Sequence, residues 1–218
     1  MGPFAYMMIG IGVAVAVGLL ISRRKKQADA RAAQRQETLS GANIQNDISR
    51  VGAGGVLALP RFLPGETGSF ETYVKSRNRY SDGESTWYEL ICEDQGRDVL
   101  VEWQRDGRSI VISVGLADQN PTLDDLGLDE AGLIAYDEGQ AEHFTWGEQT
   151  WTYVESCERH YYEGDGAEGE GLYAWEFRND DNTQFLTVEK YAGEDDFEVY
   201  HQHRVPTDQV NVFDAGNS

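Results

Sequence analysis

The chain has 218 residues, of which 38 are acidic and 18 basic, so its formal net charge is −20 at pH 7. Such a chain repels nucleic acid phosphates, and we expect no nucleic acid partner. Its two cysteines, Cys92 and Cys157, lack the C-x-x-C spacing of a redox or zinc motif, so we expect free thiols and no cofactor.

The first expected element is a single transmembrane helix within an anchor segment, residues 1–39. An uncharged run from Pro3 to Ser22 is long enough to cross the hydrocarbon core of a bilayer. No Lys or Arg precedes the run, so a secretory signal peptide is the weaker alternative. A basic cluster follows it at Arg23, Arg24, Lys25 and Lys26. Because basic residues favour the cytoplasmic side, we expect the protein in the inner (plasma) membrane, with its amino terminus outside and its body in the cytoplasm.

Charge divides the chain into two parts. Residues 1–36 hold six basic side chains and one acidic, 6 − 1 = +5, and the remainder holds 12 basic and 37 acidic, 12 − 37 = −25. The basic cluster is expected to lie at an anionic membrane surface, which repels the acidic body. The acidic surface favours a basic protein partner, and the alternative is that it only confers solubility.

After a polar helix that ends near Leu39, short apolar and aromatic runs predict an all-β body. One helical turn is expected at Asp124–Leu126. The expected strands are Val56–Leu59, Phe70–Arg79, Trp87–Cys92, Val99–Trp103, Ser109–Val114, Leu133–Tyr136, His143–Trp146, Thr150–Tyr161, Tyr173–Phe177, Phe185–Lys190 and Phe197–Gln202.

Two segments resemble each other: TYVKSRNRYSDGE at 72–84 and TYVESCERHYYEG at 152–164. The offset of 80 residues grows to 87 further along, which places an insertion at 164–171. The pattern predicts two duplicated antiparallel meander repeats, packed as a sandwich or a partly open barrel. The expected segments are 40–115 and 132–205 for the repeats, 116–131 for a connector and 206–218 for a tail.

Several short motifs carry a family resemblance. They are Val51-Gly52, Gly65-Glu66, Tyr73-Val74, Trp87-Tyr88-Glu89-Leu90 and Val101-Glu102-Trp103, with second copies at Gly147-Glu148, Tyr153-Val154, Ala174-Trp175-Glu176-Phe177 and Val188-Glu189. The chain thereby resembles the bacterial family catalogued as domain of unknown function 4178, over about residues 50–115 and 132–205. The family usually has a Trp-Leu pair on the closing strand, from which this chain departs. The resemblance implies no reaction, but an association with membrane-stress proteins.

Two histidines are the metal-ligand candidates. His201 and His203 alternate on one expected strand and so project from the same face, as two ligands would. A third ligand has no recognisable spacing, although His143 or His160 would serve if the fold brought it close. Structural or solvent-facing histidines are the commoner explanation of this pattern.

Four residues are candidates for a ligand site. Glu89 and Glu176 occupy matching repeat positions and are flanked by aromatics, so they would form a carboxylate pair across a two-fold-like interface. Trp87 and Trp175 would contribute to an aromatic pocket, although strand tryptophans more often pack in a core. The Gly-rich acidic segment 164–171 lacks the spacing of a calcium-binding loop.

These patterns favour a membrane-anchored, non-enzymatic adaptor that binds a protein partner. A small-ligand sensor with an enclosed pocket is the first alternative, and a metal-dependent enzyme the second. No phosphate-binding loop, nucleophile motif or paired metal motif occurs in the sequence.

Overall fold

The computed structural model describes residues 44–45, 47–107, 109–164 and 166–213. The predicted anchor, its basic cluster and the polar helix that follows lie outside these residues. Among the residues described, no helix is long and apolar enough to cross a membrane.

Most of the described chain is β-strand. The first meander consists of β3 (Ser69–Ser81), β4 (Thr86–Asp94), β5 (Arg97–Asp106) and β6 (Ser109–Leu116). The second consists of β8 (Gln149–Tyr162), β9 (Glu170–Asn179), β10 (Gln184–Tyr191) and β11 (Glu198–Val205). The remaining elements are β1 (Ile44–Gln45), β2 (Val56–Pro60), β7 (His143–Trp146), β12 (Asn211–Phe213), the helix α2 (Glu130–Asp137) and 3-10 turns at Ile48–Arg50, Ala117–Gln119 and Thr207–Gln209.

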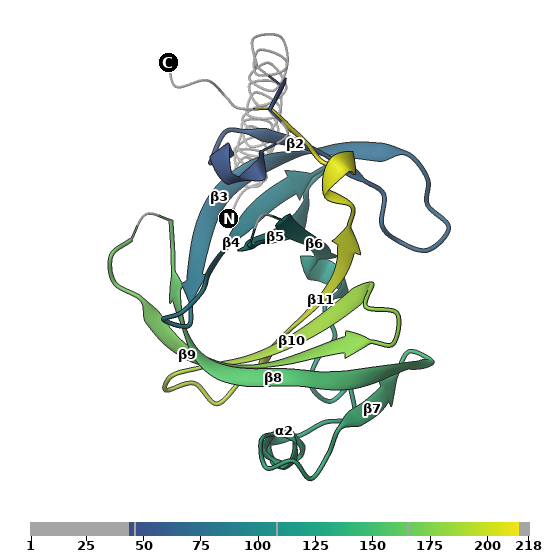
Figure 1. The fold of residues 1–218 in the computed structure, drawn as a ribbon, viewed down its shortest axis with the longest axis vertical. Coiled ribbons are helices and arrows are strands. Elements are labelled where there is room, and N and C mark those ends of the chain that lie inside the picture. Colours follow the sequence, from purple (N-terminus) through teal and green to yellow (C-terminus); the bar gives the residue numbers. More distant parts are fainter. Residues whose placement is uncertain (1–43, 46, 108, 165, 214–218) are drawn as a thin grey trace, which may run out of the picture.

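The two meanders form one barrel-like ring (Figure 1). Its strand order is β3-β4-β5-β6-β11-β10-β9-β8, and β8 pairs again with β3. Both seams are antiparallel: Tyr80 is opposite Tyr161 between β3 and β8, and Val114 is opposite His203 between β6 and β11. The prediction of an all-β antiparallel fold is therefore confirmed, and the sheet takes the barrel form of the two alternatives.

One predicted strand is wrong. The run Leu133–Tyr136 lies in the helix α2. The Asp129 side chain accepts a hydrogen bond from the Gly132 backbone N–H at 2.7 Å and caps the first turn. Leu133 and Tyr136, three residues apart, are the buried side chains of this helix. Where the helical turn is expected, at Asp124–Leu126, the structure has a hydrogen-bonded turn, in which the Leu126 backbone N–H donates to the carbonyl oxygens of Thr122 and Leu123.

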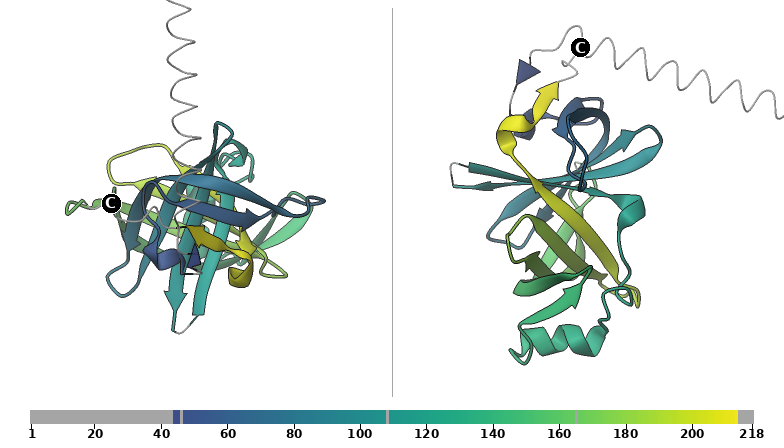
Figure 2. Two further views of the ribbon diagram at one scale, coloured as in Figure 1. Left: turned by 90° about the horizontal axis from the view of Figure 1, so that it is seen from above. Right: turned by 90° about the vertical axis from the view of Figure 1, so that its right-hand side faces the viewer.

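Each meander has its own apolar core on the outside of the ring. The core of the first meander lies under β2, β12 and the turn at Ile48–Arg50; it contains Leu57, Val74, Leu90, Val101, Trp103, Ile112, Val114 and Val212. The core of the second lies under α2 and the segment before it; it contains Leu126, Leu133, Trp151, Trp175, Phe177, Leu186, Val188 and Val199. Figure 2 shows β12 and α2 at opposite ends of the molecule. The face that each meander turns away from its core therefore lines the lumen.

Candidate functional site

The lumen of the ring is lined by polar and charged side chains. Asn78, Glu89, Glu102 and Ser113 lie directly opposite one another across β3, β4, β5 and β6. On the other side of the ring, Arg159 and Glu189 project inward from β8 and β10. Six lumen side chains are almost completely buried: Asn78 (2% exposed), Glu89 (6%), Ser113 (7%), Arg159 (4%), Glu189 (4%) and Gln202 (5%). Burying such groups is costly unless they are hydrogen-bonded or paired.

Arg159 is the buried cation of the lumen. Its Nη2 lies 2.5 Å from Oε1 of Glu176, and its guanidinium carbon lies 4.8 Å from the ring centroid of Trp87. Its Nε also donates to the Cys157 sulfur at 3.3 Å. Burial lowers the pKa of Arg159, but the Glu176 carboxylate and the Cys157 sulfur together more than offset this, so the pKa is raised overall. Arg159 is therefore a permanent cation that already has its counter-charge.

Two buried glutamates have few partners of their own. Within the described chain, Glu89 receives one hydrogen bond, from Asn78 Nδ2 to Oε1 at 3.1 Å. Glu189 receives one from the Tyr191 hydroxyl to Oε2 at 3.3 Å. Burial raises the pKa of Glu89, and it raises the pKa of Glu189 to about 8. The half-buried Glu102 also has a pKa of about 8, because of burial and then the Glu176 charge. The lumen therefore holds more carboxyl groups than cations.

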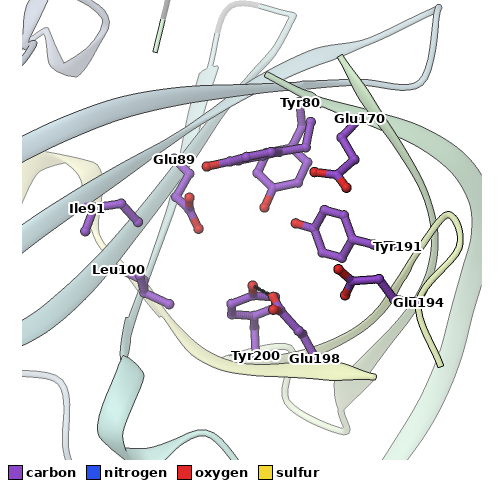
Figure 3. A pocket seen from close by; sticks show the side chains of 10 residues that line it. Tyr80, Glu89, Ile91, Leu100, Glu170, Tyr191, Glu194, Glu198 and Tyr200 are labelled. Carbon is purple, nitrogen blue, oxygen red and sulfur yellow. Dashed lines mark hydrogen bonds between the residues drawn. The ribbon is translucent and has the colours of Figure 1, made fainter. Parts of the chain in front are cut away.

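A cavity of about 330 Å³ opens from one end of the lumen (Figure 3). Its lining consists of four tyrosines, four glutamates and two aliphatic residues: Tyr80, Tyr161, Tyr191, Tyr200, Glu89, Glu170, Glu194, Glu198, Ile91 and Leu100. Figure 3 shows the carboxylates of Glu89, Glu170 and Glu194 and the Tyr191 hydroxyl turned towards one shared space. None of the described lining residues is basic. Volumes of about 300 to 1,000 Å³ are typical of small-molecule sites.

The cavity deepens from an acidic rim to a buried floor. Glu170, Glu194 and Glu198 are exposed, whereas Tyr80 and Glu89 are buried. The Tyr80 ring is stacked on Trp87 and tilted against Tyr161, with centroids 5.6 and 5.1 Å apart. Burial raises the pKa of Tyr80, and raises that of Tyr161 to about 12. The tyrosines therefore stay neutral at physiological pH and present hydroxyl groups and ring faces to the cavity.

Two further hollows differ in character. One of about 180 Å³ at the other end of the lumen is lined by Glu102, Glu176 and Arg178 among others. A broader one of about 530 Å³ beside β9 and β10 includes Arg159 and Lys190 with Glu158 and Glu194. Both of these hollows are lined by acidic and basic side chains. Of the three described hollows, the 330 Å³ cavity alone has acidic and no basic side chains in its lining.

The structure brings some of the predicted site residues into the lumen but does not pair them. Glu89 and Glu176 both face the interior, yet Glu89 is bound by Asn78 and Glu176 by Arg159. Trp87 borders the lumen, whereas Trp175 packs in the outer core of the second meander. Tyrosines, not the predicted tryptophans, line the 330 Å³ cavity. One sequence signal indicates these tyrosines. Glu189 is a charged residue within an apolar strand, and Tyr191, two positions later, projects from the same face of that strand.

The histidine candidates lie on the outside of the ring. His201 and His203 are adjacent, with ring centroids 4.9 Å apart. His201 Nε2 lies 2.9 Å from Gln184 Oε1, and burial lowers the pKa of His201 to about 4. His143 and His160 are exposed. In the part of the chain that the structure describes, no group of three or more His, Cys, Asp or Glu side chains is arranged to hold a metal ion.

The fold and the site together define an antiparallel β-barrel with a polar lumen and a tyrosine- and glutamate-lined cavity. The chain belongs to the family described as domain of unknown function (DUF4178), whose family model matches residues 65–207. This match spans both meanders from β3 to β11. No curated protein and no solved structure shows significant similarity to the chain.

Proposed function

We propose that this protein is a non-catalytic receptor module that takes a small molecule into the lumen of its barrel. The observation that carries the proposal is the partition of side chains between the two faces of the sheet. Both meanders place their apolar face outward, under the covers formed by β2, β12 and α2, and their charged face inward.

Burying charged side chains in the lumen costs free energy, which suggests that these side chains serve a function. Small barrels usually fill their interior with side chains, and apolar ones suffice for stability. Here Glu89, Arg159 and Glu189 are buried inside, and each loses hydration that its few partners only partly replace. Places where a sequence departs from the rules of stable packing are commonly functional sites. A ligand that completes the lumen hydrogen bonds and charges would recover part of that cost.

The receptor function is tested by thermal unfolding of the full-length chain. A cell extract is separated by dialysis into a dialysable, small-molecule fraction and a macromolecular fraction, and each is added to the chain. The dialysable fraction should raise the midpoint of the wild-type chain and leave that of Ile91→Trp unchanged, because Ile91 lines the cavity and the larger ring would fill it. The matched control is Ile134→Trp, at a side chain 46% exposed on α2. Stabilisation of all three chains to the same extent, or by the macromolecular fraction alone, would contradict the proposal.

A second candidate is an adaptor whose acidic surface binds a basic protein. The net charge of −20 favours it. Such binding should weaken as salt rises, because screening shortens the range of surface charges. Isolation of the full-length chain from membranes at low and high salt tests this candidate, which fails if no partner is retained at low salt.

We also propose that the chain is anchored in the inner membrane by residues 1–39, with its body in the cytoplasm and a role in the membrane-stress response. A reporter that is active only in the cytoplasm, fused after Ser218, should then work. If a periplasm-active reporter works instead, the topology is wrong.

Duplication of one meander would explain the symmetry of the ring. Val74 lies on β3 and Val154 on β8, the first strand of each meander, and both strands carry a register shift next to these residues. A short preceding strand pairs with the start of each, β2 with β3 and β7 with β8. The ladders are not identical, because Glu89 is opposite Glu102, whereas Glu176 is opposite Thr187, two residues from Glu189.

A further inference from the structure

The 330 Å³ cavity lined by tyrosines and glutamates has the chemistry of a cation site. Its four carboxyl groups come from β4, β9, β11 and the loop after β10. Within the described part of the chain, none of the four forms an ion pair. The buried cation of the lumen does not serve them, because Arg159 is already paired with Glu176. Among the described lining residues, the cavity therefore has four carboxyl groups and no basic side chain.

The floor of the cavity supplies a second, independent indication. Glu89 is 6% exposed, and the one hydrogen bond that it receives within the described chain comes from Asn78 and occupies Oε1. Figure 3 shows this carboxyl group turned into the cavity, towards the space that a ligand would fill. A carboxyl group that is largely buried and has a single hydrogen-bond donor keeps acceptor capacity that the ammonium group of a ligand would use.

The aromatic lining favours an organic cation over a metal ion. Tyrosine rings attract ammonium groups through the negative charge of their π faces. Four tyrosines surround the cavity, with Ile91 and Leu100 for alkyl groups. Divalent metals instead need several oxygen or nitrogen ligands at short distance, and no described group of such side chains is arranged in this way.

We propose that this cavity binds the alkylammonium group, primary or quaternary, of a small organic cation, with Glu89 at its floor and the four tyrosines around it. The inference rests on the receptor function proposed above and names its ligand class. The exposed glutamates Glu170, Glu194 and Glu198 attract the cation to the mouth, and the cation exchanges part of its hydration for tyrosine faces and the Glu89 carboxylate. A primary ammonium would also donate hydrogen bonds to the tyrosine hydroxyls.

The test is calorimetric titration of the full-length chain, at constant ionic strength, with choline, n-butylammonium, 3,3-dimethyl-1-butanol and calcium chloride. The alcohol has the shape of choline without its charge. Choline or n-butylammonium should bind with one-to-one stoichiometry, and the alcohol and calcium should not. Glu89→Gln keeps the size and the contact with Asn78 but removes the charge, so it should weaken ammonium binding at least about tenfold. The control Glu84→Gln, at an exposed turn residue, should change it less than about twofold.

The outcomes separate this inference from the receptor function. Equal binding of the alcohol and choline, or binding of calcium alone, would overturn the cation class and leave a receptor for another ligand. Equal weakening by Glu84→Gln would place the cation on the surface and overturn the site. If neither ammonium ion binds, the cation class is wrong, and the extract experiment decides whether the receptor function fails with it. Unfolding midpoints of both variants show whether a loss of binding reflects a loss of fold.

Discussion

Arg159 on β8 and Glu176 on β9 form an ion pair 2.5 Å apart inside the barrel, and it is the arginine side of the pair that is buried, at 4% exposed. Removing one partner of a buried pair leaves an uncompensated charge. Arg159→Met leaves the lumen carboxyl groups without their cation, and we expect the free energy of unfolding to fall by about 3 kcal/mol.

Urea unfolding measures this loss. Lys75→Met is the matched control, since it breaks an exposed pair with Asp98 at a similar distance, 2.7 Å, and should cost less than about 1 kcal/mol. Adding Glu176→Gln to Arg159→Met should restore part of the stability. Equal losses in Arg159→Met and Lys75→Met would show that Arg159 has no special role in the lumen.

The buried carboxyl groups predict a decrease in stability with rising pH. The pKa of Glu189 is about 8 in the folded chain, against an ordinary value of 4.5. Between these values the folded chain holds a proton that the unfolded chain has released, so the free energy of unfolding falls as pH rises through the window and levels off above it. The half-buried Glu102 acts in the same direction.

Urea unfolding from about pH 7 to 9 avoids the histidines, whose ordinary pKa lies near 6.5. Glu189→Gln cannot ionise, so its stability should vary less with pH than that of the wild-type chain and should exceed it at the alkaline end. Glu84→Gln should retain the wild-type slope. A wild-type stability that rises over this range would contradict the assignment of neutral carboxyl groups to the lumen.

The seam between β6 and β11 depends on a glycine. A Cβ at Gly115 would lie 2.6 Å from the His201 backbone carbonyl oxygen, so Gly115→Ala would force the two strands apart. We expect a loss of about 2 kcal/mol in the free energy of unfolding. At Gly52 a Cβ would have no atom within 4 Å, and Gly52→Ala should change stability by less than about 0.5 kcal/mol. If both substitutions have the same effect on urea unfolding, the β6 and β11 backbones do not approach each other as closely at Gly115 as the structure indicates.

Most strands could be predicted from the sequence, but the face of the sheet that lines the lumen could not. His143–Trp146 coincides with β7, because alternation and flanking turn residues mark a strand locally. Leu133–Tyr136 was misassigned, because a short apolar run has no period long enough to separate helix from strand. The Asp129 cap, three residues before Gly132, was the local signal for a helix.

The cavity was less predictable than the strands. Its tyrosines come from β3, β8, β10 and β11, and the β3–β8 seam that brings Tyr80 beside Tyr161 joins residues about 80 positions apart. Alternation also assigns apolar residues to an interior, whereas here β2, β12 and α2 bury them outside the ring. Glu89 and Trp87 are buried at the lumen, and the sequence indicates Glu89 through its matching repeat position and its aromatic neighbours.

The most direct test of the cation site is the nuclear Overhauser effect between the methyl protons of tetramethylammonium and tyrosine ring protons of the full-length chain. Replacing Tyr80, Tyr191 and Tyr200 one at a time by Phe assigns the signals while preserving the rings. The proposed site predicts contacts from the methyl protons to several of these rings, all of which disappear in the cavity-filled variant Ile91→Trp. Contacts confined to tyrosines outside the cavity, such as the partly exposed Tyr73, or contacts that persist in Ile91→Trp, would contradict it.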